Sequence, residues 1–438
     1  MNYSNIDIDI NILRNIMLEK GYNRNIDDQF SIHIAKDTDQ EVEAIINLNL
    51  TVHKVELLRS FIPRIFYDHP KKDDIFWLYI MDKKKKKMVS SICLVPLDWK
   101  IEMWNLPACE MEFVGTLEEY RGIGLIKELN QLYEDIMLEK GYLLSAIRGI
   151  PYYYRSLGYE YISSLDERIT LPISKIPSTE LTKVNIRKAN TADLTFIESK
   201  YNEFHKKFFI FNKFDPKCFA FKYINDHFDV EDRSTYIFEE NGESKNYFSL
   251  GLSYDGQNYE IICPDLENRY MVKLLQFIKE YGKSSSDDMI TLSISEVSSL
   301  YNYIQSLEGK ALPTYGWQIK IPNLNIFFNS IKPLVEERVK NSIFKDITKN
   351  VRISNYRETV ELGIKQGEIK QINVKKGYPD LRETELRVPS SLLFKILLGD
   401  KLFDEISYII KDAIIDLSSK ALIETLFPKK ASLLGSYV

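Results

Sequence analysis

The sequence has little cysteine, with four residues in 438, and none of them forms a CxxC pair. This scarcity excludes a disulfide framework and argues against a zinc site, so we expect no metal and four buried thiols in a reducing cytoplasm. No run of about 18 uncharged apolar residues occurs, and the N-terminus lacks a basic start followed by an apolar stretch. We therefore expect neither a membrane span nor an export signal.

A surplus of positive charge is also missing, because the formal net charge is −5. Such a chain has no overall field that would attract nucleic acid or an anionic membrane, and an amine substrate fits it better. Hydrophobic residues make up 44% of the chain and charged residues 28%, which predicts a globular protein. Its length exceeds the ~250 residues of a single core, so we expect two or three domains.

The first part of the chain mixes strand and helix patterns. A short amphipathic helix, Ile8 to Lys20, ends at Gly21, where a left-handed cap is easiest. Asp82 to Lys87, DKKKKK, lies between two apolar runs and is typical of a solvated hairpin loop. The pattern predicts an α/β (α+β) domain over 1–171. Its expected strands are 31–35, 75–81, 88–95, 108–115, 142–147 and 161–171, and its expected helices are 40–50, 52–61 and 123–140.

Two further domains are expected beyond this one. Residues 171–183 contain two prolines and several small polar residues, which is typical of a linker. A strand over 184–189 and a helix to about 206 then open a second mixed domain, 183–321. Beyond Pro322 the pattern predicts a smaller α+β domain, 322–438. It has expected helices over 324–341, 390–398 and 418–426, and short strands over 351–375.

The most informative stretch is 114–127, VGTLEEYRGIGLIK, which joins a predicted strand to a predicted helix. Its turn holds Gly115, Gly122 and Gly124, and glycine lets the backbone come close to a ligand. The helix that follows directs free N–H groups and the positive end of its dipole at that turn. The stretch therefore predicts a site for a pyrophosphate.

Two other nucleotide-binding patterns do not fit. A dinucleotide fingerprint needs G-x-G-x-x-G, but Lys127 stands at the third glycine position. A phosphate loop needs G-x-x-x-x-G-K-[ST], and the GKS at Gly282 has Phe277 in place of the first glycine. Neither pattern explains the turn.

The run RGIGLI, which begins at Arg121, resembles the pyrophosphate signature of the GNAT superfamily of N-acetyltransferases, R/Q-x-x-G-x-G/A. The last position departs, because Ile126 stands where glycine or alanine is usual. The resemblance implies acetyl-CoA as co-substrate, with its pantetheine arm paired to the main chain of Val114, Gly115 and Thr116. It implies that the pyrophosphate is held by Arg121, Gly122, Ile123, Gly124, Leu125, Ile126 and Lys127.

A second segment supports this resemblance. Residues 152–159, YYYRSLGY, are similar to the GNAT segment F/Y-Y-x-x-x-G-F/Y, in which the tyrosine before x-x-x-G lies beside the thioester sulfur. That position is Tyr154, with Gly158 and Tyr159 after it. The resemblance implies that Tyr154 is the general acid that protonates the leaving thiolate, whereas Tyr152 and Tyr153 are more typical of packing.

The rest of the chain resembles GNAT proteins of the enhanced intracellular survival type, in the segments YGWQIKIPNLNIFFNSIKPLVEERV (315–339) and LRVPSSLLFKILLG (386–399) and in the ending LFPKK. That type implies two GNAT-like domains, the second without a cofactor signature, followed by a sterol-carrier-protein-like domain. Residues 184–321 indeed contain no R-x-x-G-x-G/A run. The type also implies the terminal carboxylate as the base, which here belongs to Val438.

These features predict an N-acetyltransferase for an aminoglycoside, polyamine or lysine-type acceptor, and they are compatible with a homo-oligomer. The base is either Val438 or one of Glu110 and Glu112, which lie two apart on the strand before the glycine turn. Cys93 and Cys109 have no histidine nearby in the sequence, and we interpret both as core residues. All five histidines lie away from the signature. The alternative is a non-catalytic acyl-CoA or lipid carrier on a degenerate scaffold.

Overall fold

The computed structural model describes residues 18–436, apart from 166, 180–182, 225–232, 254–257, 282–287 and 390. The chain forms two compact units, one of Met1–Val95 with Met111–Tyr142 and one of Pro96–Glu110 with Leu143–Val438. Two long strands, β4 (Lys87–Ile101) and β5 (Trp104–Thr116), contribute residues to both. The predicted first helix and Val438 lie outside the described residues, except for the last residues of that helix.

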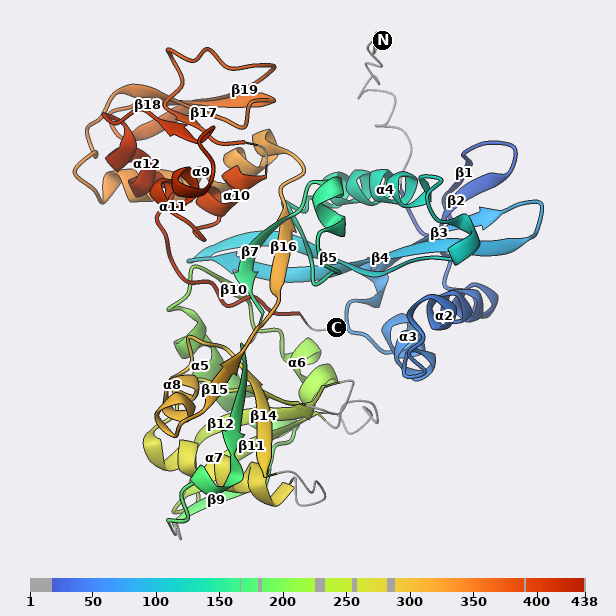
Figure 1. The fold of residues 1–438 in the computed structure, drawn as a ribbon, viewed down its shortest axis with the longest axis vertical. Coiled ribbons are helices and arrows are strands. Elements are labelled where there is room, and N and C mark those ends of the chain that lie inside the picture. Colours follow the sequence, from blue (N-terminus) through green and yellow to red (C-terminus); the bar gives the residue numbers. More distant parts are fainter. Residues whose placement is uncertain are drawn as a thin grey trace. The chain divides into compact units, whose positions relative to one another are not determined.

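The first unit is a sheet covered on both faces. Its strands β1, β2, β3 and β4 are consecutive and antiparallel. Figure 1 shows α4 on one face of these strands and α2 with α3 on the other. The elements are β1 (Asn23–Asn25), β2 (Phe30–Ile34), α2 (Asp39–His53), α3 (Leu58–Tyr67), β3 (Phe76–Asp82), α4 (Leu125–Lys140) and the 3₁₀ turns η1 (Lys72–Asp74) and η2 (Glu118–Tyr120).

Local signals in the sequence explain several of these boundaries. Thr38 and Glu41 form a capping box that begins α2. Lys54 takes the left-handed conformation, φ 57°, and ends α2, so the helix predicted over 52–61 begins later, at Leu58. The lysine-rich segment after Asp82 is the turn of the β3–β4 hairpin, as predicted. All four cysteines are buried free thiols, which confirms their interpretation as core residues.

The second unit contains the other half of the first sheet. The later half of β4, the earlier half of β5 and the strands β6, β16 and β7 follow one another, and β10 pairs with the end of β4. Strand β16 comes late in the chain, yet it lies between β6 and β7 and is antiparallel to both. The bounds are β6 (Leu144–Ile147), β7 (Glu160–Ser164), β10 (Ile210–Asn212), β16 (Gly316–Lys320) and the 3₁₀ turn η3 (Tyr153–Leu157).

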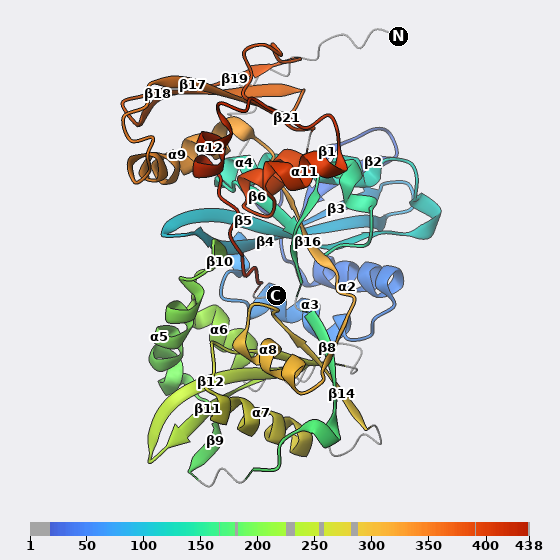
Figure 2. The same cartoon turned by 60° about the vertical axis from the view of Figure 1, so that its left-hand side comes forward.

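A second sheet of this unit has the strand order β15-β8-β14-β13-β12-β11-β9. Its buried side chains include Phe238, Phe248 and Leu274. Figure 2 shows α7 and α8 beside this sheet. The elements are β8 (Glu167–Pro172), η4 (Ile173–Lys175), β9 (Val184–Lys188), η5 (Thr191–Asp193), α5 (Leu194–His205), α6 (Pro216–Tyr223), β11 (Ser234–Glu240), β12 (Glu243–Leu252), β13 (Tyr259–Ile262), α7 (Asn268–Tyr281), β14 (Met289–Ile294), α8 (Ser299–Ser306) and β15 (Lys310–Leu312).

The single strand predicted over 161–171 is wrong, because it divides into β7 and β8. Strand β7 pairs with β16 in the first sheet, whereas β8 pairs with β14 and β15 in the second. An alternating apolar pattern shows that a segment is extended, but it does not identify its partner strand. The partners were therefore decided by tertiary contacts.

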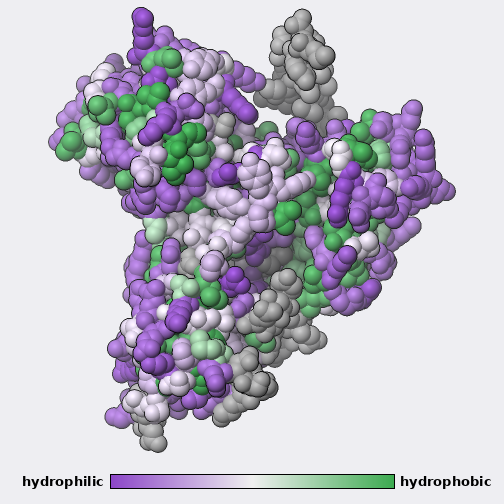
Figure 3. Space-filling view, viewed as in Figure 1, coloured by the Kyte–Doolittle hydropathy of each residue, from purple (hydrophilic) through white to green (hydrophobic). Residues whose placement is uncertain are grey.

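In the last part of this unit, the described helices pack against a sheet of order β19-β18-β17-β20-β21. Figure 3 shows hydrophobic residues gathered on the visible side that carries the helices, and Tyr408 and Ile409 are 85% and 80% exposed. The elements are α9 (Leu324–Lys340), β17 (Lys349–Ser354), β18 (Glu358–Lys365), β19 (Glu368–Lys376), β20 (Leu386–Arg387), α10 (Leu392–Leu397), α11 (Phe403–Ile409), β21 (Ile414–Ile415) and α12 (Lys420–Leu426). Among the described residues, no helix is both long enough and apolar enough to span a bilayer.

Candidate active site

The predicted glycine turn lies between β5 and α4 in the first unit. Gly122 and Gly124 have φ values of 81° and 92°, the left-handed region that favours glycine. A Cβ built on either residue would meet nothing within 4 Å, so both face open space. Gly124 is the N-cap of α4, and among the described residues no side chain caps this helix end. The first-turn N–H groups of α4 can therefore bind an anion.

The end of β5 offers main-chain groups beside this turn. Among the described residues, the pairing of β5 with β6 ends at Glu110, and Phe113 has a φ of 51°. The strand therefore continues through Val114 to Thr116 without a register partner from β6. An edge of this kind can pair with an extended ligand as it would with an added strand, which is the role predicted for Val114, Gly115 and Thr116.

Asp82 holds Tyr120, which lies just before the turn of Gly122 and Gly124, in place by a hydrogen bond. Its carboxylate accepts a hydrogen bond from the hydroxyl of buried Tyr120 at 3.0 Å, and others from Gln29 and the N–H groups of Lys84 and Lys85. These bonds, led by the one from the Lys85 N–H, lower the pKa of Asp82 to about 2. The hairpin turn and the glycine turn are thus joined through one carboxylate, a connection that the sequence analysis missed.

Tyr154 lies in the second unit, in η3. Its side chain is 5% exposed and makes edge-on ring contacts with Tyr153 and Tyr159. A Cβ on Gly149 would come within 2.0 Å of the Tyr154 ring, so only glycine fits there. Gly158 ends η3 with a φ of 90°. The Tyr–x–x–x–Gly spacing thus has a local structural reason, because the glycine closes the turn that carries Tyr154.

The two glutamates considered as bases have different surroundings. Glu110 belongs to the second unit, is fully buried, and accepts a hydrogen bond from Arg148 Nε at 2.7 Å. Its Oε2 atom is buried and has no partner among the described residues. Glu112 belongs to the first unit and is half-buried. An ion pair with Arg148 therefore already engages Glu110.

The chain's last segment is held along β10 by hydrogen bonds. Leu433 N donates to Ile210 O at 2.8 Å, and Phe211 and Leu433 form a parallel bridge. Further on, Trp99 Nε1 donates to Gly435 O at 3.1 Å, and the Lys222 ammonium donates to Ser436 O at 3.0 Å. The segment is therefore docked as far as Ser436, two residues before the predicted base, Val438.

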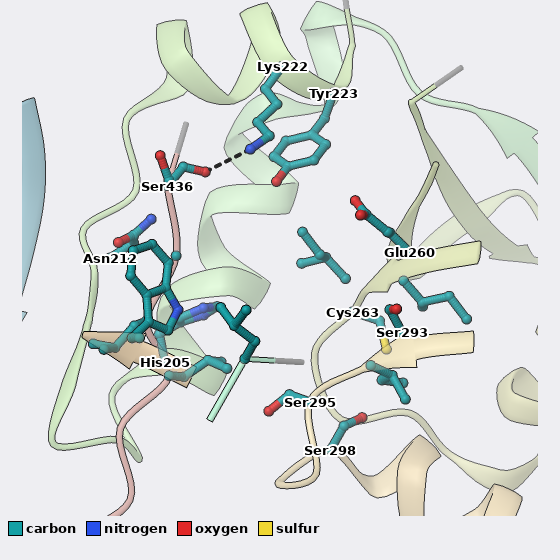
Figure 4. Close-up of a pocket in the computed structure, with 18 of the residues that line it drawn as sticks. His205, Asn212, Lys222, Tyr223, Glu260, Cys263, Ser293, Ser295, Ser298 and Ser436 are labelled. Atoms are coloured by element: carbon teal, nitrogen blue, oxygen red, sulfur yellow. Dashed lines mark hydrogen bonds between the residues drawn. The ribbon is translucent and has the colours of Figure 1, made fainter. Parts of the chain in front are cut away.

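A cavity of about 390 Å³ lies in the second unit beside this segment. Figure 4 shows Lys222 and Tyr223 on one side and Ser295 and Ser298 on the opposite side, with Asn212 drawn between His205 and the tail residue Ser436. Lining residues come from α5, α6, β13, β14, β16 and the C-terminal segment. Most of them lie far apart in the sequence and form no motif, so the sequence analysis missed this cavity.

His205 is the one histidine that lines this cavity among the residues described. It is buried, its ring stacks on Tyr201 with centroids 3.5 Å apart, and Nδ1 is 2.9 Å from Tyr201 O. Burial lowers its pKa to about 4, and the hydrogen bond to Tyr201 opposes that change. His205 is therefore neutral at pH 7 and adds no charge to the cavity.

The structure thus brings the predicted residues together in two groups. The glycine turn and Val114–Thr116 belong to the first unit together with Glu112, whereas Tyr154 and the docked tail belong to the second.

Residues 33–162 match the family model of the acetyltransferase (GNAT) domain. This range contains the glycine turn and Tyr154, and this part of the chain belongs to the GNAT superfamily.

Several solved structures share the fold of nearly the whole chain. One is a probable N-acyltransferase from Enterococcus faecalis, with a TM-score of 0.70, 14% identity, and coverage of 95% of this chain and 100% of the other. Another is a GCN5-related N-acetyltransferase from Anabaena variabilis, with a TM-score of 0.65 and 14% identity. The match covers 92% of this chain and 99% of the other. A third is Eis1 from Mycobacterium abscessus, with a TM-score of 0.59 and 9% identity. The match covers 92% of this chain and 99% of the other. No match was found among curated proteins. The multidomain α+β fold predicted from the resemblance is confirmed.

Proposed function

We propose that the protein transfers an acetyl group from acetyl-CoA to an amine. The observation that carries this proposal is the turn of Gly122 and Gly124, which opens onto the uncapped start of α4 within a GNAT domain. The pyrophosphate is bound there by main-chain N–H groups, with the side chains of Arg121 and Lys127 nearby in sequence. The pantetheine arm pairs with the main chain of Val114 to Thr116.

The reaction needs no covalent acyl-enzyme, because a thioester is already activated. The amine nitrogen attacks the thioester carbonyl, the C–S bond breaks, and the leaving thiolate takes a proton from the Tyr154 hydroxyl. The nitrogen loses a proton to solvent as the amide forms, and a proton from solvent restores the Tyr154 hydroxyl. The proton of the acceptor ammonium goes to a base. We assign this base to the carboxylate of Val438, supported by the docking of the tail through Ser436, with Glu112 as the other candidate.

The test compares two glycines at opposite ends of α4. Gly124→Val places a branched side chain at a φ of 92° in the pyrophosphate site, so acetyl-CoA binding measured by calorimetry should be lost. Gly141→Val is the matched control, because Gly141 ends the same helix at a φ of 78° and also faces open space. It should lose similar stability but keep acetyl-CoA affinity. Equal affinity in both variants would overturn the proposal.

The carrier alternative rests on the exposed apolar residues Tyr408, Ile409 and Leu417 in the last part of the chain. It predicts that acyl-CoA or lipid binds without turnover. Release of free thiol from acetyl-CoA, measured with a panel of polyamines, aminoglycosides and lysine peptides, distinguishes the two. Amine-dependent release supports the transferase, and binding without release with any amine supports the carrier.

A further inference from the structure

The lysine-rich turn of the β3–β4 hairpin lies beside the segment that leads into α4. Leu117 N donates to Val89 O at 3.0 Å, and the ammonium of Lys87 pairs with Glu119 at 3.3 Å. Figure 1 shows the hairpin turn and the start of α4 at the same end of the first unit. Both belong to that unit, so the lysines are neighbours of the proposed pyrophosphate site.

Lys85 is the lysine of this turn that lies against the segment before the two glycines. Its ammonium is 5.0 Å from the ring centre of Tyr120, and Tyr120 directly precedes Arg121 and Gly122. The face of an aromatic ring attracts a cation. Tyr120 is buried and its hydroxyl donates to Asp82, whereas Lys85 is exposed. A fixed ring therefore positions the Lys85 ammonium while leaving it open to a ligand.

Lys83, two residues earlier, lies on the other side of the hairpin. Its ammonium donates to Asn25 Oδ1 at 3.0 Å and to Asp27 O at 2.6 Å, at the end of β1 and just beyond it. The turn between β1 and β2 also contributes the carboxylates of Asp27 and Asp28 to this side. Lys83 and Lys85 thus carry the same charge in the same turn but have different surroundings.

Most carboxylates near Lys85 are already engaged. Asp82 is buried and accepts hydrogen bonds from Tyr120 and from main-chain N–H groups. Glu119 and Glu128 each form an ion pair at 3.3 Å, and Glu118 is exposed. Among the described residues, the cations here without a carboxylate partner are Lys85, Arg121 and Lys127. An anionic ligand at this place therefore meets more free cations than free carboxylates.

The proposed donor carries an anionic group besides its pyrophosphate. CoA has a phosphate on the 3′-oxygen of its ribose, and such a monoester has a charge of about −1.5 to −2 at pH 7. The same ribose is joined directly to the pyrophosphate, so the 3′-phosphate lies close to the place where the pyrophosphate is bound. A lysine ammonium is a common partner for a phosphate.

We propose that Lys85 binds the 3′-phosphate of acetyl-CoA and thereby selects CoA over its dephosphorylated form. This inference rests on the proposed function, since it takes the pyrophosphate to lie at Gly122 and Gly124. Tyr120 is a positioning residue for Lys85, because its ring lies beneath the ammonium and its hydroxyl is bonded to Asp82.

The first experiment compares two ligands that differ by one phosphate. CoA and 3′-dephospho-CoA are titrated into the full-length protein by calorimetry. CoA should bind about tenfold or more tightly, the size of one hydrogen bond between charged groups. Equal affinities would overturn the inference and leave the acetyltransferase proposal intact. Absence of binding by either ligand would overturn both.

Two variants of the hairpin turn test the assignment to Lys85. Lys85→Gln should weaken CoA binding several-fold and keep the affinity for 3′-dephospho-CoA within about twofold. Lys83→Gln is the matched control, because it removes the same charge from the side of the turn that contacts Asn25. It should keep the wild-type ratio of the two affinities. Equal ratios in the two variants would overturn the assignment.

Turnover provides a second readout. The 3′-phosphate takes no part in the reaction, so Lys85→Gln should raise the KM for acetyl-CoA several-fold and keep kcat within about twofold. The assay measures thiol release with an amine from the panel above, and Lys83→Gln is again the control. A lower kcat at unchanged KM would overturn the role of Lys85 at the 3′-phosphate.

Discussion

At the residue scale, Tyr154 has the packing of a fixed group rather than of a mobile surface tyrosine. Two ring contacts and the glycine at position 149 hold its ring. We expect Tyr154→Phe to keep acetyl-CoA affinity within about twofold, because the ring packing is retained. Turnover should fall ~10² to 10⁴-fold, the usual contribution of a positioned acid. Single-turnover kinetics and calorimetry on the same preparation check both values, and an unchanged rate would give Tyr154 a structural role.

His205 makes stability depend on pH. Its pKa is 6.5 in an unfolded chain but about 4 in the folded protein, so the unfolded state binds more protons between these values. The free energy of unfolding contributed by His205 is thus complete above pH 6.5 and falls as pH decreases towards 4, by at most about 1.4 kcal/mol per pH unit.

A His205→Phe variant should lack this component of the pH dependence. Denaturant unfolding of both proteins at pH 7 and pH 5 measures the difference, and His33→Phe provides a control at a histidine that is less deeply buried. If wild type and His205→Phe lose the same stability between these pH values, His205 does not titrate as expected.

At the element scale, the C-terminal segment acts as an added strand along β10. Hydrogen bonds at Leu433, Gly435 and Ser436 fix its position. Extending the chain by one glycine moves the terminal carboxylate by up to ~3.5 Å and keeps the docked residues. If the carboxylate of Val438 is the base, turnover should fall steeply at unchanged acetyl-CoA affinity, and the pH profile of turnover should lose its acidic limb.

A matched variant separates the charge from the chain length. Amidation of the terminus by chemical ligation keeps the length and removes the charge, so it should slow turnover as the glycine extension does. Normal turnover in both proteins would reject the carboxylate of Val438 as the base and favour Glu112.

At the scale of the whole molecule, the part of the chain that the structure describes contains one glycine turn that leads directly into a helix start, at Gly122 and Gly124. Residues 184–321 lack the R-x-x-G-x-G/A run, although their sheet with its flanking helices repeats the mixed architecture of the first part. We therefore expect one acetyl-CoA per chain. Calorimetry with a concentration standard measures this stoichiometry, and a value of two would show that the second sheet binds the cofactor by another arrangement.

The sequence alone determined the features that depend on local geometry. The glycines of the turn, the start of α4, the hairpin after Asp82 and the Tyr154 turn each follow from backbone conformations that neighbouring residues impose. For this reason the strand and helix predictions agree with the structure over most of the described residues from 18 to 160. The GNAT signature lies in one such local segment, which is why it could be recognised without any structure.

Tertiary structure decided which distant segments meet. The insertion of β16 between β6 and β7, the division of 161–171 between two sheets and the docking of Leu433 beside Phe211 join residues that are many positions apart. No local preference encodes such pairings, because they depend on which strand edges and apolar faces remain uncovered once the elements have formed. The cavity beside the tail has the same origin, since its lining residues come from separate elements and meet only when the chain has folded.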